Sequence, residues 1–275
     1  MAPQDFPPHP RLAPYLHAFT VIERRFDHPH TTFDILPDTT IELVWNVGTD
    51  FAVVRPDQHH ALPSCYVVGL LQTPLRIIAH GLVRVVRAQL YPWGLRPLLG
   101  TMIFSPPFDS AGLLWVDQAL HPPGSLKYES ESGPLVAEME HVLLKQVASA
   151  SSAPPADFRA VQSILDRHGA SELQELAREL ALSDRSLRRH VQRAADSTPK
   201  ALARLARFEY VRNRLWAQPD TPLATVALEA GYSDQAHMNR EYRRFSQRTP
   251  RQFLADMEDL RALFTPKSGR NLQDD

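Results

Sequence analysis

The sequence predicts an α+β protein of two domains, a β-rich N-terminal domain and an all-α C-terminal domain. Nineteen of the 24 prolines precede residue 156, and they interrupt every long helix before about residue 134. Explicit helix-start signals follow that residue. Between the two parts lies S-A-S-S-A-P-P-A, a small, polar and proline-rich stretch typical of a linker. We therefore expect a β-barrel or cupin-like domain with trailing helices at 1–148, a linker at 149–156, a helical domain at 157–263 and a flexible tail at 264–275.

The composition is that of a soluble globular protein, with 43% hydrophobic residues. No stretch approaches the roughly eighteen consecutive apolar residues of a membrane span. The N-terminus has neither the basic start nor the apolar core of a secretion signal. Cys65 is the only cysteine, which excludes an internal disulfide and a thiolate zinc cluster within one chain. We therefore expect a cytoplasmic protein with no membrane partner and no cofactor.

Short runs rich in β-branched and aromatic residues fill the N-terminal part, and turn residues separate them. The runs are T-F-D-I-L, T-I-E-L-V-W-N-V, F-A-V-V, C-Y-V-V-G-L, L-R-I-I-A and L-V-R-V-V-R-A-Q-L-Y. Several alternate between apolar and polar residues, and others are continuously apolar over four to eight positions. We interpret residues 15–95 as a barrel or sandwich of short strands.

An amphipathic helix is predicted at residues 133–148, after the β-rich runs. Its apolar residues recur at helical spacing, at Leu135, Met139, Val142, Leu143 and Val147. Such a stripe packs on the barrel, on a second chain, or on both. We expect that it supports a homodimer formed by the N-terminal half.

Seven helices are predicted after the linker, near 157–168, 171–180, 184–195, 199–217, 222–230, 234–246 and 250–260. Threonine followed by proline marks a helix start at Thr198, Thr221 and Thr249. Ser171 and Gln174 have the spacing of a capping box. Gly169 and Gly231 stand where a preceding helix ends in a left-handed turn.

Two of these helix pairs form an internal near-repeat, S-E-L-Q-E-L-A-R-E-L-A-L-S-D at 171–184 and T-P-L-A-T-V-A-L-E-A-G-Y-S-D at 221–234. Each has a short helix with a small residue inside, a tight turn, and Ser-Asp opening a second helix. Small residues let two helices cross closely, as in a helix-turn-helix. We expect Gly231 to make the second turn and Ser233 to cap the helix that follows.

The second helix of each pair is predicted to turn a basic and amide face outward. Leu187, Val191 and Ala194 form the buried stripe of one helix, and Met238, Tyr242 and Phe245 that of the other. The candidate DNA-reading residues are Arg185, Arg188, Arg189, Gln192, Gln235, Asn239, Arg240 and Arg243. Arg, Asn and Gln are the side chains that hydrogen-bond guanine and adenine edges in the major groove.

Charge supports this interpretation. Although the net charge of the chain is −1, residues 183–251 carry 14 Lys and Arg against 7 Asp and Glu. Residues 1–155 carry 10 against 14. A basic segment of this kind suits an anionic polymer, although a solvated helix face is the commoner explanation of charge alone.

The segment 157–256 resembles the DNA-binding domain of AraC/XylS-type transcriptional regulators, which contains two helix-turn-helix units joined by a long helix. The most specific part is L-A-T-V-A-L-E-A-G-Y-S-D-Q-A-H-M-N-R-E-Y-R-R-F-S-Q-R-T-P-R-Q-F. It departs from the family pattern at Met238, where phenylalanine is usual, and at Gln247-Arg248, where a glycine is common. We expect a looser turn at the second place. The resemblance assigns base reading to Arg185, Arg188 and Arg189, and to Gln235, Asn239 and Arg240.

The N-terminal half is similar to the β-rich sensor domain of a little-characterised AraC-type subgroup, on F-D-I-L-P-D-T-T-I-E-L-V-W-N-V-G, V-V-G-L and A-Q-L-Y-P-W-G-L-R-P-L-L-G. In the wider family such domains bind small effectors or mediate dimerisation. The resemblance therefore implies a transcription regulator with double-stranded DNA, a small-molecule effector and, for an activator, RNA polymerase as partners.

The histidines, tryptophans and the cysteine of the N-terminal half allow other interpretations. His28 and His30 form H-x-H, and His59-His60 follow, so a cupin-like metalloenzyme (an isomerase or dioxygenase) fused to a DNA-binding domain is the alternative function. Pro29 separates the first pair and no carboxylate follows closely, which favours surface imidazoles. Trp45, Trp93 and Trp115 suit either a pocket or the core, and the core is the more common place for tryptophan. Cys65 is expected to be a small buried hydrophobe.

Overall fold

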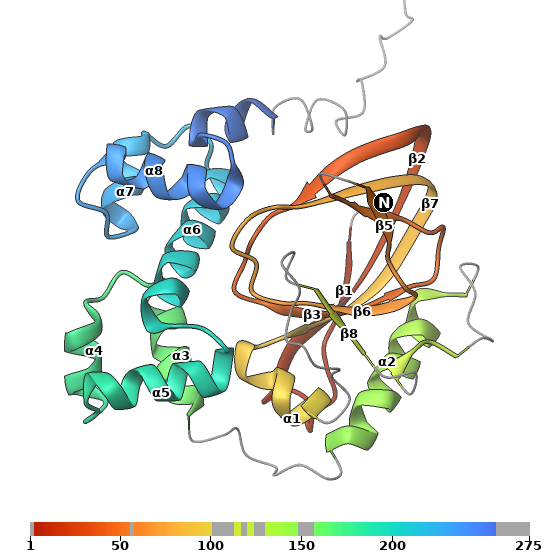
Figure 1. Cartoon of the computed structure of the whole chain (residues 1–275), viewed down its shortest axis with the longest axis horizontal. Coiled ribbons are helices and arrows are strands. Elements are labelled where there is room, and N and C mark those ends of the chain that lie inside the picture. The colour runs from red at the N-terminus through yellow and green to blue at the C-terminus, as the bar shows by residue number, and fades with distance from the viewer. Residues whose placement is uncertain are drawn as a thin grey trace, which may run out of the picture.

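The computed structural model describes residues 3–55, 58–100, 113–116, 120–123, 130–147 and 157–256. An antiparallel sheet domain and a helical domain lie side by side in it (Figure 1). The predicted linker at 149–156 and tail at 264–275 lie outside the described residues. No helix among the described residues is long and apolar enough to cross a membrane.

The N-terminal domain is built on one antiparallel sheet. Its strands are β1 (Gln4–Phe6), β2 (Leu16–Ile35), β3 (Ile41–Asn46), β4 (Ala52–Val54), β5 (His59–Ala61), β6 (Cys65–Val68), β7 (Leu75–Leu90) and β8 (Leu113–Trp115). The strand order is β1-β2-β7-β3-β6-β8, and β4 pairs with both β5 and β7. Within the described residues the pairing does not close into a ring, so the expected barrel is a curved sheet here.

Two strands are much longer than the sequence runs suggested. The runs L-R-I-I-A and L-V-R-V-V-R-A-Q-L-Y form one strand, β7, which continues through Gly81 at a φ of 66°. It pairs with β2 along nearly its whole length, with a register shift between Phe26 and Thr31. Pro29 lies within that shift, where a missing N–H does not interrupt the ladder. The strands β1, β5 and β8, of three residues each, were not among the predicted runs.

Each face of the sheet has its own apolar core. One core includes Leu16, Leu43, Trp45 and Val86, and it is covered by α1 (Leu95–Leu99) and α2 (Ser132–Val147). The opposite face, which we call the inner face, carries a second core that includes Val44, Tyr66 and Val85. The alternation of neighbours such as Leu43 and Val44 between the two cores follows from the period of a strand.

The apolar stripe of the helix at 133–148 is buried against its own sheet. Leu135, Met139 and Leu143 are fully buried in the core beneath α2, and Val142 packs partly against it. The prediction that this stripe supports a dimer is therefore wrong, because the stripe is not free to pack on a second chain. The face of the sheet opposite the inner face is apolar, and α2 of the same chain covers it.

The helical domain contains α3 (Phe158–Asp166), α4 (Leu173–Glu179), α5 (Asp184–Ala195), α6 (Pro199–Ala217), α7 (Leu223–Glu229) and α8 (Gln235–Ser246), and residues 250–256 are also helical. All seven predicted helices are present. Their ends differ by a few residues from the predicted ones, and residues 257–260 of the last predicted helix lie outside the described residues. Thr198 caps α6, since its Oγ1 accepts a hydrogen bond from the Ala201 N–H, and Thr249 accepts one from Gln252.

Three predicted caps are wrong, because the helices begin later than expected. Helix α4 starts at Leu173, so Ser171 stands outside it and accepts from Arg167 instead of forming a capping box with Gln174. Helix α7 starts at Leu223, which leaves Thr221 to accept from Arg214. Helix α8 is capped by Asp234, whose carboxylate accepts from the His237 N–H, and not by Ser233.

Candidate nucleic-acid interface

Two helix-turn-helix units flank α6, as the near-repeat predicted (Figure 1). Helices α4 and α5 form the first unit, and α7 and α8 form the second. The small residues at their crossings, Ala177 and Ala227, are buried. An arginine–glutamate ion pair holds each unit to the helix before it, and the sequence repeat did not predict these ion pairs. The Arg167 guanidinium bonds both carboxylate oxygens of Glu179, and Arg214 bonds both of Glu229.

The two turns differ by one residue. Gly231 takes a left-handed conformation with a φ of 74°, and Ala181 takes the same role in the first unit with a φ of 53°. The helix cap follows two residues after Ala181, at Ser183, and three residues after Gly231, at Asp234. The buried Leu187 of α5 therefore corresponds to the buried Met238 of α8. This shift pairs Arg188 with Asn239, Arg189 with Arg240, and Gln192 with Arg243.

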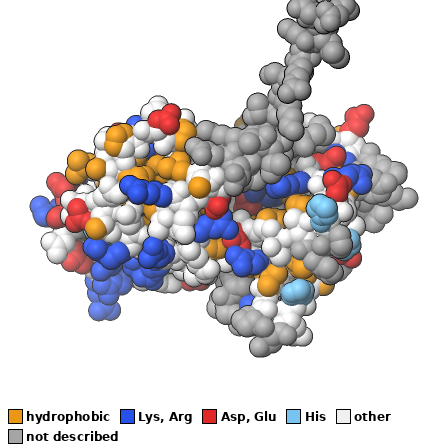
Figure 2. All heavy atoms as spheres, turned by 90° about the horizontal axis from the view of Figure 1, so that it is seen from above, with side chains coloured by type: hydrophobic (Ala, Val, Ile, Leu, Met, Phe, Trp, Pro, Cys, Tyr) orange, Lys and Arg blue, Asp and Glu red, His pale blue; other side chains and the backbone are white. Residues whose placement is uncertain are grey.

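The structure places most of the eight candidate residues on open surface. Exposed are Arg185, Arg188, Arg189 and Gln192 on α5, and Arg240 and Arg243 on α8. Gln235 and Asn239 are half-buried, and the Asn239 Oδ1 is buried with no hydrogen-bond partner. Arg244 is also exposed beside Arg243, although its position was not selected from the sequence. Lysine and arginine side chains gather along one edge of the helical part (Figure 2).

The core stripes beneath these faces are the predicted ones. Leu187, Val191 and Ala194 are buried in one cluster, and Met238, Tyr242 and Phe245 in another. Met238 is fully buried, so methionine fits the place where phenylalanine is usual. The turn after α8 is not loose, because Gln247 adopts the left-handed conformation at a φ of 57° without a glycine. There the Ser246 Oγ accepts from the Arg248 N–H and donates to the Tyr242 carbonyl.

A buried ion-pair cluster fixes α8 on α6. The Glu241 carboxylate, only 4% exposed, bonds the guanidinium groups of Arg204 and Arg207. Arg207 also donates to the Gly169 carbonyl at 3.0 Å, in the turn between α3 and α4. One arginine of α6 therefore contacts both α8 and the turn that leads into the first unit.

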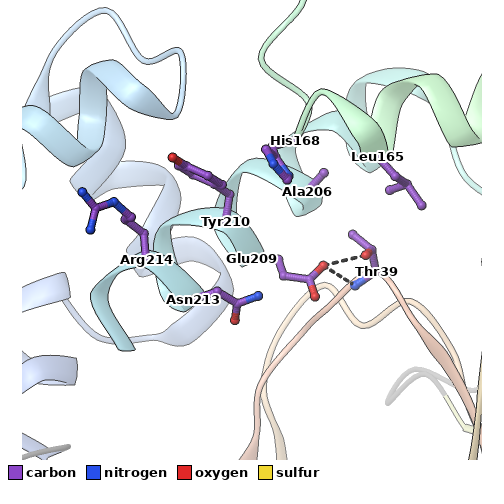
Figure 3. A pocket seen from close by; sticks show the side chains of 8 residues that line it. All are labelled: Thr39, Leu165, His168, Ala206, Glu209, Tyr210, Asn213 and Arg214. Carbon is purple, nitrogen blue, oxygen red and sulfur yellow. Dashed lines mark hydrogen bonds between the residues drawn. The ribbon is translucent and has the colours of Figure 1, made fainter. Parts of the chain in front are cut away.

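The N-terminal domain contacts the helical domain through the loop between β2 and β3. Oε2 of Glu209 accepts hydrogen bonds from the Thr39 N–H at 3.0 Å and from the Thr39 hydroxyl at 2.5 Å (Figure 3). Arg212 donates to the Pro37 carbonyl at 2.7 Å. Asp34 bonds both Arg76 of its own sheet and Arg248, which follows α8. We call the residues of this junction, Asp34, Pro37, Thr39, Glu209, Arg212 and Arg248, the loop clamp.

A second contact joins the sheet domain to the first unit. Trp93, in the 3-10 helix η1 (Pro92–Gly94), is buried with the apolar residues of α3 and α5. Its ring lies 5.6 Å from that of Phe158, and its Nε1 donates to the Pro14 carbonyl. Trp45 is fully buried in the core under α2, and both tryptophans are therefore core residues; the side chain of Trp115 lies outside the described ones.

Burial excludes a reactive role for the cysteine. Cys65 is 0% exposed, as expected, and burial raises the pKa of its thiol to about 12, although a hydrogen bond with Trp45 opposes the shift. Of the metal candidates, His28, His59 and His60 are exposed, and the side chain of His30 is not described. No group of three or more metal-ligating side chains occurs within the described residues.

Two family models match the chain. Residues 176–256 match a family described as a helix-turn-helix domain, and residues 4–105 match a domain of unknown function, DUF6597. No curated protein matches.

Solved structures show a weaker similarity. ToxT from Vibrio cholerae is 11% identical, covers 86% of this chain and 98% of its own, and has a TM-score of 0.49. The C-terminal domain of AraT, a response regulator from Geobacillus stearothermophilus, is 19% identical, with coverages of 44% and 92% and a TM-score of 0.35. A probable AraC family transcriptional regulator from Rhodopseudomonas palustris is 24% identical, with coverages of 36% and 96% and a TM-score of 0.31.

Proposed function

We propose that the chain is a DNA-binding transcription regulator of the AraC type, in which α5 and α8 read one asymmetric site, because residues 176–256 match a helix-turn-helix domain. The supporting observation is that two exposed arginine and amide faces stand on one joining helix. The 19 residues of α6 span about 28 Å at roughly 1.5 Å per residue. That length is close to the roughly 34 Å between successive major-groove faces on one side of B-DNA.

The structural pairing of the two units supports a proposed role for each candidate. We propose that Arg189 and Arg240 make the central base contacts, since both are exposed and occupy equivalent places. Arg185, Arg188 and Gln192 extend the face of α5. On α8, Arg243 extends the face, while the half-buried Gln235 and Asn239 contact the edge of the site.

Selection of duplexes from a random pool tests this function directly. The full chain should enrich one sequence with two parts about a helical turn apart, since α5 and α8 would enter successive major grooves. Its affinity should fall steeply with salt, because each phosphate neutralised by Lys or Arg releases counterions. Absence of any enriched sequence at low salt would contradict the proposal.

We propose that a small effector bound to the N-terminal domain controls DNA binding. The inner face of the sheet has a cavity of about 180 Å³. Two of its lining residues, Ile35 and Glu42, stand at either end of the loop that carries Pro37 and Thr39 of the loop clamp. A ligand there would contact the strand ends that hold α6. We propose the loop clamp as the route of control, because it joins this end of the sheet directly to α6.

The remaining partners are proposed on functional grounds. We propose that two copies associate through N-terminal surfaces other than the stripe of α2, because linked readers gain avidity at paired sites. Sedimentation of the full chain at micromolar concentration tests this. As an activator the protein would also contact RNA polymerase. We place it in the cytoplasm and assign it no catalytic activity; the metalloenzyme alternative requires stoichiometric bound metal in the purified protein.

A further inference from the structure

The cavity on the inner face of the sheet is apolar at its walls. It lies among β2, β3, β6 and β7, and its apolar lining includes Phe26, Phe33, Val44, Val68 and Val85. Phe26 and Phe33 stack with ring centroids 5.4 Å apart. A volume of about 180 Å³ is below the roughly 300–1,000 Å³ of pockets for drug-sized molecules. The occupant is therefore a small molecule, of the size of one substituted ring.

A buried ion pair lies at the polar end of this cavity. Glu42 and Arg87 both line it, and Arg87 Nη1 donates to Glu42 Oε1 at 2.7 Å. The Glu42 side chain is only 9% exposed. Burial raises the pKa of Glu42, and the charge of Arg87 opposes that rise. The two charges compensate each other, so this end of the cavity carries no net charge.

One donor of this pair has no partner. The Nε–H of Arg87 is buried and makes no hydrogen bond. An unsatisfied buried donor is destabilising, and a ligand oxygen placed against it would remove that penalty. The ligand needs one hydrogen-bond acceptor on an otherwise apolar body.

The ion pair also selects against charged ligands. A carboxylate that reached Arg87 would lie beside the Glu42 carboxylate, and an ammonium group that reached Glu42 would lie beside Arg87. Burying a further charge in an apolar site is costly unless it gains its own partner. The third charged lining residue, Arg24, is exposed and stands over the Phe26 ring at 4.9 Å, at the edge of the cavity.

From these observations we infer that the cavity binds a small uncharged molecule, an apolar ring or branched chain with one carbonyl or hydroxyl oxygen that accepts from Arg87. This inference rests on the proposed effector control and specifies the chemical class of the effector. The proposal that α5 and α8 bind DNA stands independently of this inference.

Four probes of matched size test the inference on the full chain. Benzamide is uncharged with an acceptor, toluene lacks the acceptor, and benzoate and benzylamine carry opposite charges. Ligand-observed NMR titrations should show benzamide binding at least about tenfold more tightly than each of the other three, a difference of about 1.4 kcal/mol. Equal or tighter binding of benzoate or benzylamine overturns the charge argument. No binding of any probe at millimolar concentration, with DNA binding intact, overturns the site and leaves the proposed DNA-binding function standing.

Two variants locate the binding. Val85→Phe fills the cavity and should abolish binding of benzamide, whereas unchanged binding would place the probe elsewhere and overturn the inference. In the double variant Glu42→Gln with Arg87→Met both charges are removed together, which a fold tolerates better than the loss of one. The preference of this variant for benzamide over toluene should disappear. A retained tenfold preference would show that Arg87 does not donate a hydrogen bond to the ligand oxygen, and it would overturn the inference. Circular dichroism and DNA binding of each variant check that the fold persists.

Discussion

Single residues in the helical domain hold its helices together, and Glu241 joins α8 to α6. Its carboxylate is nearly inaccessible and is shared by two arginines of α6. Sequence periodicity predicted the neighbouring Tyr242 and Phe245 in the core, but no sequence signal indicated that Glu241 is buried. The reason is that the partners of Glu241 are 34 and 37 residues away along the chain.

Glu241→Gln should destabilise the helical domain by about 3 kcal/mol, because it leaves two partly buried guanidinium groups without a counter-charge. Urea unfolding followed by circular dichroism measures this. Glu175→Gln is the matched control, since Glu175 is exposed on α4, and it should change stability by less than about 0.5 kcal/mol. Equal unfolding midpoints for the two variants would show that the buried cluster contributes nothing.

At the scale of the element, α5 and α8 are equivalent helices. Relative to the Ser-Asp pair at the start of each, α8 starts one residue later than α5. The repeat in the sequence aligned the two Ser-Asp pairs, and that alignment would match Arg188 with the core residue Met238. The structure aligns the buried stripes instead, because the turn at Gly231 is longer by one residue. Burial therefore decides which side chains of the two helices occupy equivalent places.

Arg189→Ala and Arg240→Ala should each lose about 1–3 kcal/mol of discrimination, at bases about one helical turn apart. Binding of each variant to single-base changes in the selected duplex measures the loss. Arg193→Ala is the control on the same helix as Arg189. Its side chain, 64% exposed, is engaged by Asp157 of the α3 end at 3.6 Å, one turn beyond Arg189, so the base preferences of this variant should match the wild type. Wild-type discrimination in both test variants would disprove the assignment of these faces.

At the scale of the whole molecule, the loop clamp and Trp93 join the sheet domain to both ends of the helical domain. The clamp connects residues 170 or more positions apart, such as Thr39 with Glu209 and Pro37 with Arg212. Burial raises the pKa of Glu209, with Asp38 adding to the rise, while its bonds to Thr39 oppose it. The pKa of this carboxyl therefore stays above its usual range, because desolvation outweighs its bonds to Thr39 and the charge of Arg212.

Glu209→Ala should expose the Thr39 amide to hydrogen exchange and should change the affinity of the full chain for its duplex by about fivefold or more, the usual scale of coupling between sites. Exchange mass spectrometry and fluorescence anisotropy report the two effects. Asn213→Ala is the control, since Asn213 is exposed one turn further along α6 in the same pocket (Figure 3). If Glu209→Ala lost the amide protection but bound DNA as the wild type does, the clamp would have no regulatory role.

The sequence by itself determined the two-domain α+β fold, the seven helices and the buried stripes beneath the reading faces. These features depend on local signals, namely periodicity, helix-start residues and proline placement, which act over a few residues. Only the tertiary structure decided that the stripe of α2 covers its own sheet, that Glu241 is buried, that α8 starts one residue late, and that the loop after β2 grips α6. Those outcomes depend on contacts between segments far apart in the chain, and no local pattern in one sequence encodes them.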